Sequence, residues 1–330
     1  MDTEADSLHA YPAKLCLLQF SIPGADVLVD PLTNLDLSPL WETLRGRELL
    51  LHGSDYDLRL LREHHSFVPH AIFDTMIAAR LLGVMKFGLQ DLVGQMLGVR
   101  LEKGPQKADW AQRPLTERME NYARNDTRYL QPLVARLREQ LAAKGRVTWL
   151  EESCAALVAE CAIVPPPDPD REWRIKGAAR LTRSELAVLR ELWHWREVEA
   201  KRRNRPPFFI LSHDTLLDLS IAAVDDAPLD ALLPHRFAPH RREGVLQAIQ
   251  RGLAVPPDEC PRVLRGVSYH PTAAERTRFD RFKAHRDQRA TELGIDPTII
   301  ASKQTLELLS RKDSDPAQLL QNWQRGVMGL

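Results

Sequence analysis

Short apolar runs and longer helical repeats follow one another through the first 150 residues. Two runs, at residues 15–20 and 25–29, flank Pro23-Gly24 and predict a β-hairpin. Compact runs at residues 48–52 and 71–73 predict two further buried strands. Apolar positions at helical spacing predict helices at residues 37–44, 55–62, 76–82, 89–97 and 115–141. A hairpin followed by alternating strands and helices predicts an α/β domain, a mixed sheet flanked by helices.

Helical periodicity dominates after residue 150, where no further strand pattern is convincing. Residues 164–170 carry four prolines and two aspartates, which predicts a stiff polar linker. A second break lies near Pro256-Pro257. The chain is therefore predicted to divide into an α/β domain at 1–150, a helix end and linker at 151–170, and two small all-α domains at 171–256 and 270–330.

Composition narrows the class of protein only a little. The chain has 330 residues, with 45 basic and 45 acidic side chains, so net charge gives no indication of a polyanionic partner. No apolar run reaches the length of a membrane span, and the N-terminus lacks the pattern of a secretory signal. The four cysteines have neither zinc-type spacing nor disulfide density. We expect buried thiols in a cytoplasmic protein that does not bind membranes.

Acidic residues in four places are the candidates for chemistry. Asp2 and Glu4 are two residues apart, so on a strand both carboxylates point to one face. They repel each other unless a cation lies between them, and oxygen ligands favour Mg²⁺ or Mn²⁺. Asp57 follows an apolar strand at the start of a helix, where, like Asp55, it could simply favour the helix dipole.

Tyr122 and Asp126 complete the candidate set, because an i, i+4 pair shares one helix face. Each candidate alone could be ordinary solvated surface. Together, four carboxylates and a phenol suit phosphoryl transfer assisted by two divalent cations. The phenol could hold the attacking water in line. The residues by themselves predict only a metal-dependent phosphodiesterase.

The order of these motifs resembles a known family. Asp2-x-Glu4, the stretch from Leu51 to Leu58, Phe73-Asp74-Thr75 and Tyr122-x-x-x-Asp126 are similar to the DEDD exonucleases of the tyrosine subclass. Residues 109–115 and Tyr129-Leu130 also resemble that family, with bacterial ribonuclease D as the nearest member. The resemblance implies a ribonuclease H-like fold and stepwise 3′→5′ removal of nucleotides from RNA, such as tRNA precursors. It implies catalytic roles for five residues: Asp2, Glu4, Asp57, Tyr122 and Asp126. The four acids would bind two divalent cations, Mg²⁺ or Mn²⁺, and Tyr122 would orient water.

The helical half resembles the HRDC module. Residues 173–177, 181–203 and 205–211 are similar to one copy, and residues 276–309 are similar to a second, more divergent copy. A basic cluster, with tryptophans and Phe208 near it in sequence, could pair with phosphates and stack bases. Its members are Arg196, Lys201, Arg202, Arg203 and Arg205. A second, weaker cluster is formed by His235, Arg236, His240, Arg241 and Arg242. The first cluster could equally be a solvated helix face, and the second could be only a loop.

The front of the chain departs from the family pattern. The first carboxylate pair of the family lies well inside a strand, whereas Asp2 here directly follows Met1. We therefore hypothesise that the natural chain begins upstream. Two other functions stay open: a 3′→5′ exonuclease on single-stranded DNA, because 2′-hydroxyl contacts cannot be recognised from one sequence, and a nucleic-acid-binding protein with an impaired nuclease domain.

Overall fold

The computed structural model describes residues 1–33, 35–234, 237–264 and 269–330. The chain divides into two compact units. Unit 1 comprises Met1–Ala5, Leu15–Val164 and His270–Leu330, and unit 2 comprises Asp6–Lys14 and Pro165–Tyr269. Across the described ranges, no helix combines the length and apolar character that crossing a bilayer requires.

The first 74 residues of the chain contain the five strands that the structure describes in unit 1. β1 (Asp2–Ala5), β2 (Leu15–Ile22) and β3 (Ala25–Val29) form an antiparallel sheet, and its β2–β3 hairpin confirms the prediction. β4 (Glu48–Leu51) and β5 (Ala71–Asp74) pair in parallel. The strand hydrogen bonds thus form two sheets rather than the single mixed sheet expected. The nitrogen of Met1 donates to Leu50 O at 2.6 Å, so the start of β1 lies beside β4.

Between and after these strands, the described part of residues 1–164 forms seven helices: α1 (Ser38–Arg45), α2 (Asp55–His65), α3 (Thr75–Leu81), α4 (Leu89–Leu97), α5 (Glu117–Arg128), α6 (Leu130–Ala143) and α7 (Val147–Ala162). The single long helix predicted at 115–141 is wrong, because α5 ends and α6 begins around Tyr129. Pro132, in the first turn of α6, has no N–H for the carbonyl four residues earlier, so a continuous helix would lose that hydrogen bond there.

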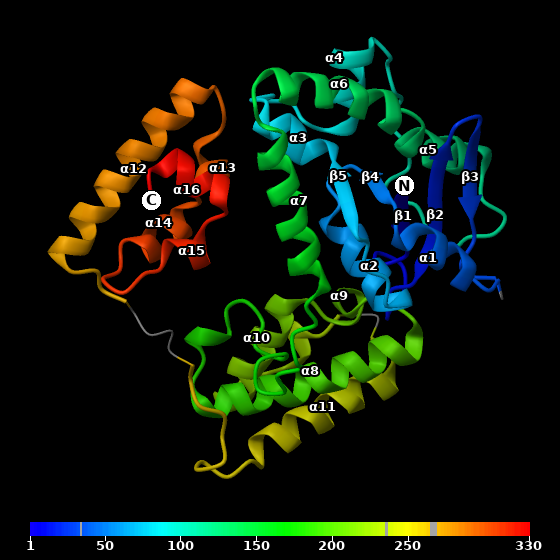
Figure 1. Ribbon diagram of the computed structural model, residues 1–330. Helices are drawn as coiled ribbons and strands as arrows, with labels where there is room; N and C mark the ends of the chain where they lie inside the picture. The colour runs from blue at the N-terminus through cyan, green and yellow to red at the C-terminus, as the bar shows by residue number, and fades with distance from the viewer. Residues whose placement is uncertain (34, 235–236, 265–268) are drawn as a thin grey trace. The chain divides into compact units, whose positions relative to one another are not determined.

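Helix packing against the sheets places the candidate residues. α5 packs on β2 and β3 and also contacts β1, whereas α7 packs on β5 and α2 (Figure 1). Leucines dominate the core between these layers, joined by Phe73 of β5 and Trp41 of α1. α5 therefore brings Tyr122 and Asp126 to the strand that carries Asp2 and Glu4.

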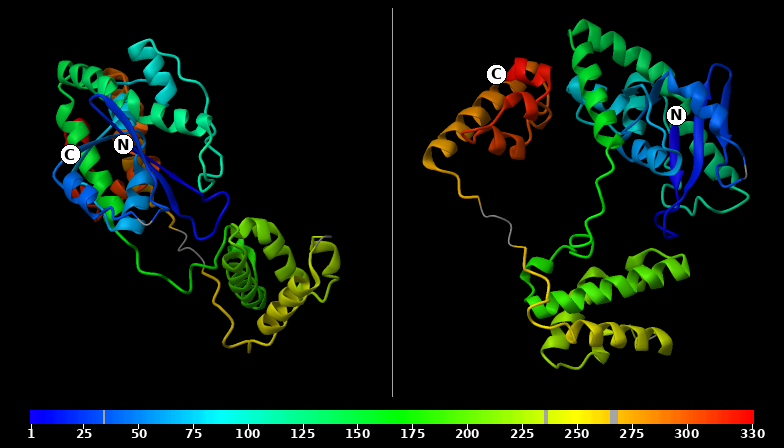
Figure 2. Two further views of the ribbon diagram at one scale, coloured as in Figure 1. Left: turned by 90° about the vertical axis from the view of Figure 1, so that its right-hand side faces the viewer. Right: turned by 60° about the horizontal axis from the view of Figure 1, so that its bottom comes forward.

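The last 61 residues of unit 1 (His270–Leu330) are helical. The long α12 (Ala273–Leu293) packs against three shorter helices, α13 (Pro297–Ile300), α14 (Lys303–Leu309) and α16 (Asn322–Met328), with α15 (Pro316–Leu319) between the last two (Figures 1 and 2). Trp323 stacks on Trp149 of α7, with ring centroids 4.7 Å apart. Arg146 Nη2 donates to Leu293 O at 2.7 Å. This segment therefore shares a core with the strands and helices of residues 1–164.

Unit 2 is built around α8 (Arg183–Arg203), which runs beside α11 (Pro239–Leu253) in Figures 1 and 2. The elements η1 (Ala178–Arg180), α9 (Pro207–Ile210), α10 (His213–Val224) and η2 (Asp230–Leu232) complete it. Its core includes Trp173, and Tyr11 of the β1–β2 loop donates its hydroxyl to Glu197 Oε2 at 2.5 Å. All four cysteines of the chain are buried thiols, as expected.

Candidate active site

β1 sets the direction of the first two carboxylates. Its pairing with β2 places Asp2 opposite Gln19 and Glu4 opposite Leu17. Because side chains alternate along a strand, Asp2 and Glu4 share one face and Thr3 points to the other, where it is buried. The extended geometry predicted for this segment is therefore present.

α5 supplies the third carboxylate of the cluster. The Thr116 side chain caps this helix by accepting from Met119 N, and acidic side chains occupy its first turn. Asp126 projects from the helix toward β1, so that ligand oxygens of Asp2, Glu4 and Asp126 all lie within 4.8 Å of one another. Residues more than 120 positions apart in sequence are thereby brought together.

The electrostatics of the cluster fit a divalent cation. Burial, reinforced by Asp2 and Asp126, raises the pKa of Glu4 to about 9. Burial likewise raises the pKa of Asp126, to about 7, and it raises the pKa of Asp2 with help from the Asp126 charge. Without a counter-charge these acids resist ionisation together. A hard divalent ion bound by carboxylate oxygens would stabilise the ionised set, so the donor chemistry matches Mg²⁺ or Mn²⁺.

Asp57 lies beside this group rather than in it. It is buried in the first turn of α2, where Thr3 Oγ1 donates to its Oδ1 at 2.5 Å. Burial raises the pKa of Asp57, and the negative charge of Asp2 raises it further. The Asp57 carboxylate therefore interacts electrostatically with the cluster. Asp55 differs, since it is exposed and bonded to Arg59, which lowers its pKa. The helix-dipole interpretation fits Asp55.

Asp74 fixes the turn that precedes α2. Its fully buried carboxylate accepts from Ser54 N and Ser54 Oγ, each at 2.8 Å, and caps α3 by accepting from Met76 N and Ile77 N. The cap on α3 confirms the prediction from Asp74-Thr75. The same carboxylate therefore ties the end of β5 to the segment that orients Asp57.

Tyr122 is enclosed on several sides. Its hydroxyl is hydrogen-bonded to Asp126 and to the Gln106 side chain, and burial is the main reason its pKa is raised. The Trp110 ring lies 6.1 Å away, and the backbone of Gly104 lies against the phenol ring. A pocket of about 350 Å³ opens between these elements. It is lined by Met1, Asp2, His52, Gly88, Leu89, Gln90, Asp91, Gln106, Tyr122 and Asp126.

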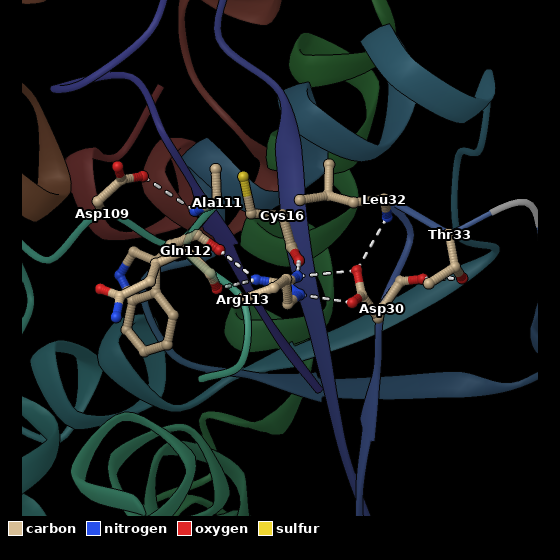
Figure 3. A network of polar contacts seen from close by, with 9 residues as sticks. Cys16, Asp30, Leu32, Thr33, Asp109, Ala111, Gln112 and Arg113 are labelled. Atoms are coloured by element: carbon tan, nitrogen blue, oxygen red, sulfur yellow. Dashed lines mark hydrogen bonds and ion pairs between the residues drawn. The ribbon is translucent and has the colours of Figure 1, made fainter. Parts of the chain in front are cut away.

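Arg113 anchors the segment at residues 109–115 (Figure 3). Its guanidinium donates to Cys16 O on β2 at 2.7 Å and forms a two-point contact with Asp30, just after β3, at 2.5 and 2.8 Å. It also donates to Trp110 O and Gln112 O. The segment that leads into α5 is therefore fixed to two strands, and this fixes where α5 begins.

Several polar residues at the site were not assigned a role from sequence, among them Thr3, His52 and Gln106. Thr3 could have been found, since the residue between two same-face carboxylates must point to the opposite face. His52 directly follows a buried strand, where its side chain can reach the sheet edge. Gln106 lies in a loop without any periodic signal.

The basic cluster of unit 2 is only partly at the surface. Arg196 is 3% exposed and bonded to Glu197 at 3.0 Å, so it does not lie on an outer face as expected. Arg196 is one of the buried residues of α8. Lys201, Arg202, Arg203 and Arg205 are all exposed, but Arg202 and Arg203 also form ion pairs with Glu199. Of the second cluster, His235 and Arg236 lie outside the described residues.

Comparison with known proteins places these features in one family. Residues 1–142 match the family model described as 3′-5′ exonuclease, and residues 185–226 match the HRDC domain. Ribonuclease D of Xanthomonas oryzae pv. oryzae is 32% identical, covering 99% of this chain and 90% of that protein. Ribonuclease D of Gluconacetobacter diazotrophicus is 31% identical, covering 100% and 85%.

Solved structures agree with the sequence relatives. The crystal structure of Escherichia coli RNase D, described as an exoribonuclease involved in structured RNA processing, is 26% identical with a TM-score of 0.75, covering 99% of this chain and 90% of that one. A protein from Bifidobacterium adolescentis superposes with a TM-score of 0.83 at 26% identity, covering 99% and 88%. The chain therefore belongs to the ribonuclease D family of 3′→5′ exoribonucleases, with an exonuclease domain followed by an HRDC domain.

Proposed function

We propose that this protein removes nucleotides from the 3′ ends of structured RNA, such as tRNA precursors, by hydrolysis that depends on two divalent cations. The observation that carries the proposal is the convergence of Asp2, Glu4 and Asp126 within 4.8 Å, with Tyr122 in the same pocket. The structured substrate is suggested by the Escherichia coli relative, whose description names structured RNA processing.

Five residues carry the proposed chemistry: Asp2, Glu4, Asp57, Tyr122 and Asp126. The four carboxylates hold the cations, which when bound neutralise phosphate charge and make water more acidic. Because burial raises its pKa, Tyr122 keeps its proton at neutral pH and acts as a hydrogen-bonding group rather than as a base. Its hydroxyl, held by Asp126 and Gln106, orients the attacking water.

A direct assay tests the activity. Labelled RNA and DNA with free or blocked 3′ ends are incubated with Mg²⁺ or Mn²⁺. We expect a ladder from free 3′ ends of RNA, which a chelator or Asp57→Ala abolishes. A ladder from DNA alone would favour the single-stranded DNA exonuclease, and binding without cleavage would favour the impaired-nuclease alternative.

We further propose that the exposed part of the basic cluster on unit 2 binds the RNA backbone. Lys201 and Arg205 are exposed, and Phe208 and Phe209 lie beside them on α9, with rings 4.5 Å apart and more than half exposed. Cations pair with phosphates and exposed rings stack on bases, so the combination suits a single-stranded tail. Arg202 and Arg203 contribute at the edge because Glu199 neutralises part of their charge, and buried Arg196 is left out.

Salt dependence tests this surface. Lys201→Ala with Arg205→Ala should weaken RNA binding and reduce the slope of log affinity against log salt by about one to two. Lys303→Ala, which removes an exposed lysine from α14, is the matched control and should leave the slope unchanged. An unchanged slope in the double variant would exclude this surface.

We also propose that residues 270–330 are a second HRDC-type module, with domain limits of 1–150, 171–256 and 270–330 and with a helix end and linker at 151–170. The support is a repeat with a constant offset of 90 residues. α8 and α12 are both 21 residues long and both begin with a Thr–Glu capping box. Each of these helices contains a buried arginine, and the two arginines are also 90 residues apart. The same offset separates two short helices that have proline in the first turn. The matched residues are Thr182 and Thr272, Arg196 and Arg286, Pro207 and Pro297, and Ser220 and Ser310.

A further inference from the structure

His52 is a polar group of the pocket that the carboxylates and Tyr122 do not use. It directly follows β4 and lines the same pocket as Asp2, Asp126 and Tyr122. The pocket, at about 350 Å³, is within the range of small-molecule sites and can hold one nucleotide. A residue in this position can contact the nucleotide that is about to leave.

The contacts of His52 determine which of its nitrogens carries the proton. The buried hydroxyl of Thr75 donates to Leu51 O at 3.1 Å, and the same hydroxyl lies 2.9 Å from His52 Nδ1. A hydroxyl has a single proton, so Thr75 must accept from Nδ1 while it donates to Leu51. In a neutral imidazole the other nitrogen, Nε2, is then an acceptor. Burial favours this neutral form, because it lowers the pKa of His52 against the opposing effect of Asp74.

Two kinds of partner do not suit Nε2, a phosphate oxygen and a hard cation. A lone pair cannot hydrogen-bond to a phosphate oxygen, which is itself an acceptor. A hard divalent cation prefers oxygen ligands to an imidazole nitrogen, and the described side chains that lie within 4.8 Å of one another at this site are the carboxylates of Asp2, Glu4 and Asp126, without His52. The partner must therefore be a hydrogen-bond donor of the substrate.

We infer that His52 Nε2 accepts a hydrogen bond from a ribose hydroxyl of the 3′-terminal nucleotide and so reads the sugar at the RNA end. This inference rests on the proposed function. The carboxylate cluster would position the scissile phosphate through bound cations, and the ribose of the terminal nucleotide is bonded to that phosphate through its 5′ oxygen, ahead of the base. The ribose hydroxyls are the only donors of that sugar, and they have no other role in the hydrolysis of its 5′ phosphate bond.

Defined 3′ ends test the inference. Labelled RNA oligonucleotides that differ only in the last sugar, carrying ribose, 2′-deoxyribose or 3′-deoxyribose, are compared by kcat/KM for removal of that nucleotide. The wild-type protein should prefer the ribose end over one of the deoxy ends by roughly three- to tenfold, the range of one neutral hydrogen bond. Which deoxy end is disfavoured identifies the hydroxyl.

Variants of His52 link that preference to its side chain. His52→Ala should lose the same three- to tenfold factor on the ribose end and cleave the ribose and deoxy ends alike. His52→Gln, whose side-chain oxygen can accept near the position of Nε2, should keep part of the preference. His64→Ala removes an exposed histidine of α2 that does not line the pocket, and should behave as wild type.

Three results overturn the inference: a wild-type protein that does not distinguish the ends, an unchanged preference in His52→Ala, or a loss in His52→Ala that depends on the terminal base instead of the sugar. The substrate series on the wild-type protein keeps the test decisive even where a variant unfolds. If the wild-type protein removes nucleotides but shows any of these results, the inference fails while the proposed function stands. If it removes none from any RNA, the proposed function itself fails.

Discussion

Gly104 and Tyr122 are in direct contact: a Cβ built on Gly104 would lie 1.6 Å from a ring carbon of the phenol. No side chain fits between that backbone and the ring. The loop that contains Gly104 is held in turn by Gln90 Nε2, which donates to Glu102 O at 3.1 Å. The loop therefore sets the position of the hydroxyl that we propose orients water.

Gly104→Ala should therefore lower kcat by displacing the ring while leaving cation affinity nearly unchanged. A 1 Å displacement of a positioning group can cost on the order of 100-fold in rate. Gly46→Ala is the matched control, because a Cβ there would meet nothing within 4 Å. Full activity in Gly104→Ala would show that the loop can shift without moving the phenol.

Tyr122→Phe and Asp126→Ala should separate two roles on one helix face. Removing the hydroxyl should lower turnover with little loss of cation binding, since a phenol orients water and the carboxylate binds the ion. Asp126→Ala should lose both. For each variant, calorimetry measures the cation affinity and single-turnover kinetics measures the rate of hydrolysis. Equal losses of affinity in the two variants would contradict this division.

Arg113→Ala should destabilise the protein by about 2 kcal/mol, because it removes charge-assisted hydrogen bonds to Asp30 and the bond to Cys16 O. Arg113→Lys keeps the charge but cannot bond both groups in the same fork-shaped geometry, so it should recover only part of the loss. Urea unfolding gives the free energies. Complete recovery in the lysine variant would mean that charge alone, without geometry, stabilises this contact.

The acidic cluster predicts an unusual pH dependence for the cation-free protein. Burial raises the pKa of Glu4 from 4.5 to about 9, so between these values the folded state binds more protons than the unfolded state. This contribution to stability is present below the unfolded pKa and is lost as pH rises toward 9. In chelator, the melting temperature should therefore fall between pH 5 and pH 9, and Mg²⁺ should restore it at high pH.

Glu4→Gln serves as the control for that measurement, because an amide does not titrate in this range. The variant should show a shallower fall of the melting temperature with pH. A wild-type melting temperature that rises from pH 5 to pH 9 in chelator would contradict the assignment of buried, mutually repelling carboxylates.

Trp323→Ala should lower the free energy of unfolding of unit 1 by about 3–5 kcal/mol, the usual range for a buried tryptophan. Its ring stacks on Trp149 and its Nε1 donates to Gln321 Oε1 at 2.6 Å. The contact joins residues 270–330 to α7, so deleting those residues would uncover Trp149. Denaturant unfolding of the variant measures the effect, and a loss below about 1 kcal/mol would show that the stacked pair is not part of a common core.

Much of this architecture follows from local sequence. The apolar runs beside Pro23-Gly24 fixed the hairpin, and Asp74-Thr75 correctly indicated a capped helix start. The break at Tyr129 was missed although Pro132 indicates it, because the apolar spacing continues through both helices. The spacing of apolar residues shows which face of a helix is buried. Where the helix ends depends instead on whether its backbone N–H and C=O groups can continue to pair.

The remaining errors come from long-range packing. Nothing in the sequence around Arg196 separates it from Lys201 or Arg205, yet one is buried with Glu197 and the others are exposed. In the same way, the proximity of Asp126 to Asp2 depends on how α5 is fixed to β2 and β3 through Arg113. Such relationships depend on pairing between distant segments, which periodicity cannot encode.

Unit 1 is assembled from both ends of the polypeptide, with most of unit 2 inserted between them in sequence. A ribosome that synthesises this chain therefore exposes the partner surface of α7 only once residues 270–330 emerge. Until then Trp149 and its neighbours stay uncovered, and the core of the nascent nuclease is completed only after those residues are synthesised. A premature stop after residue 269 would thus leave a protein that contains every proposed catalytic side chain but lacks part of its support.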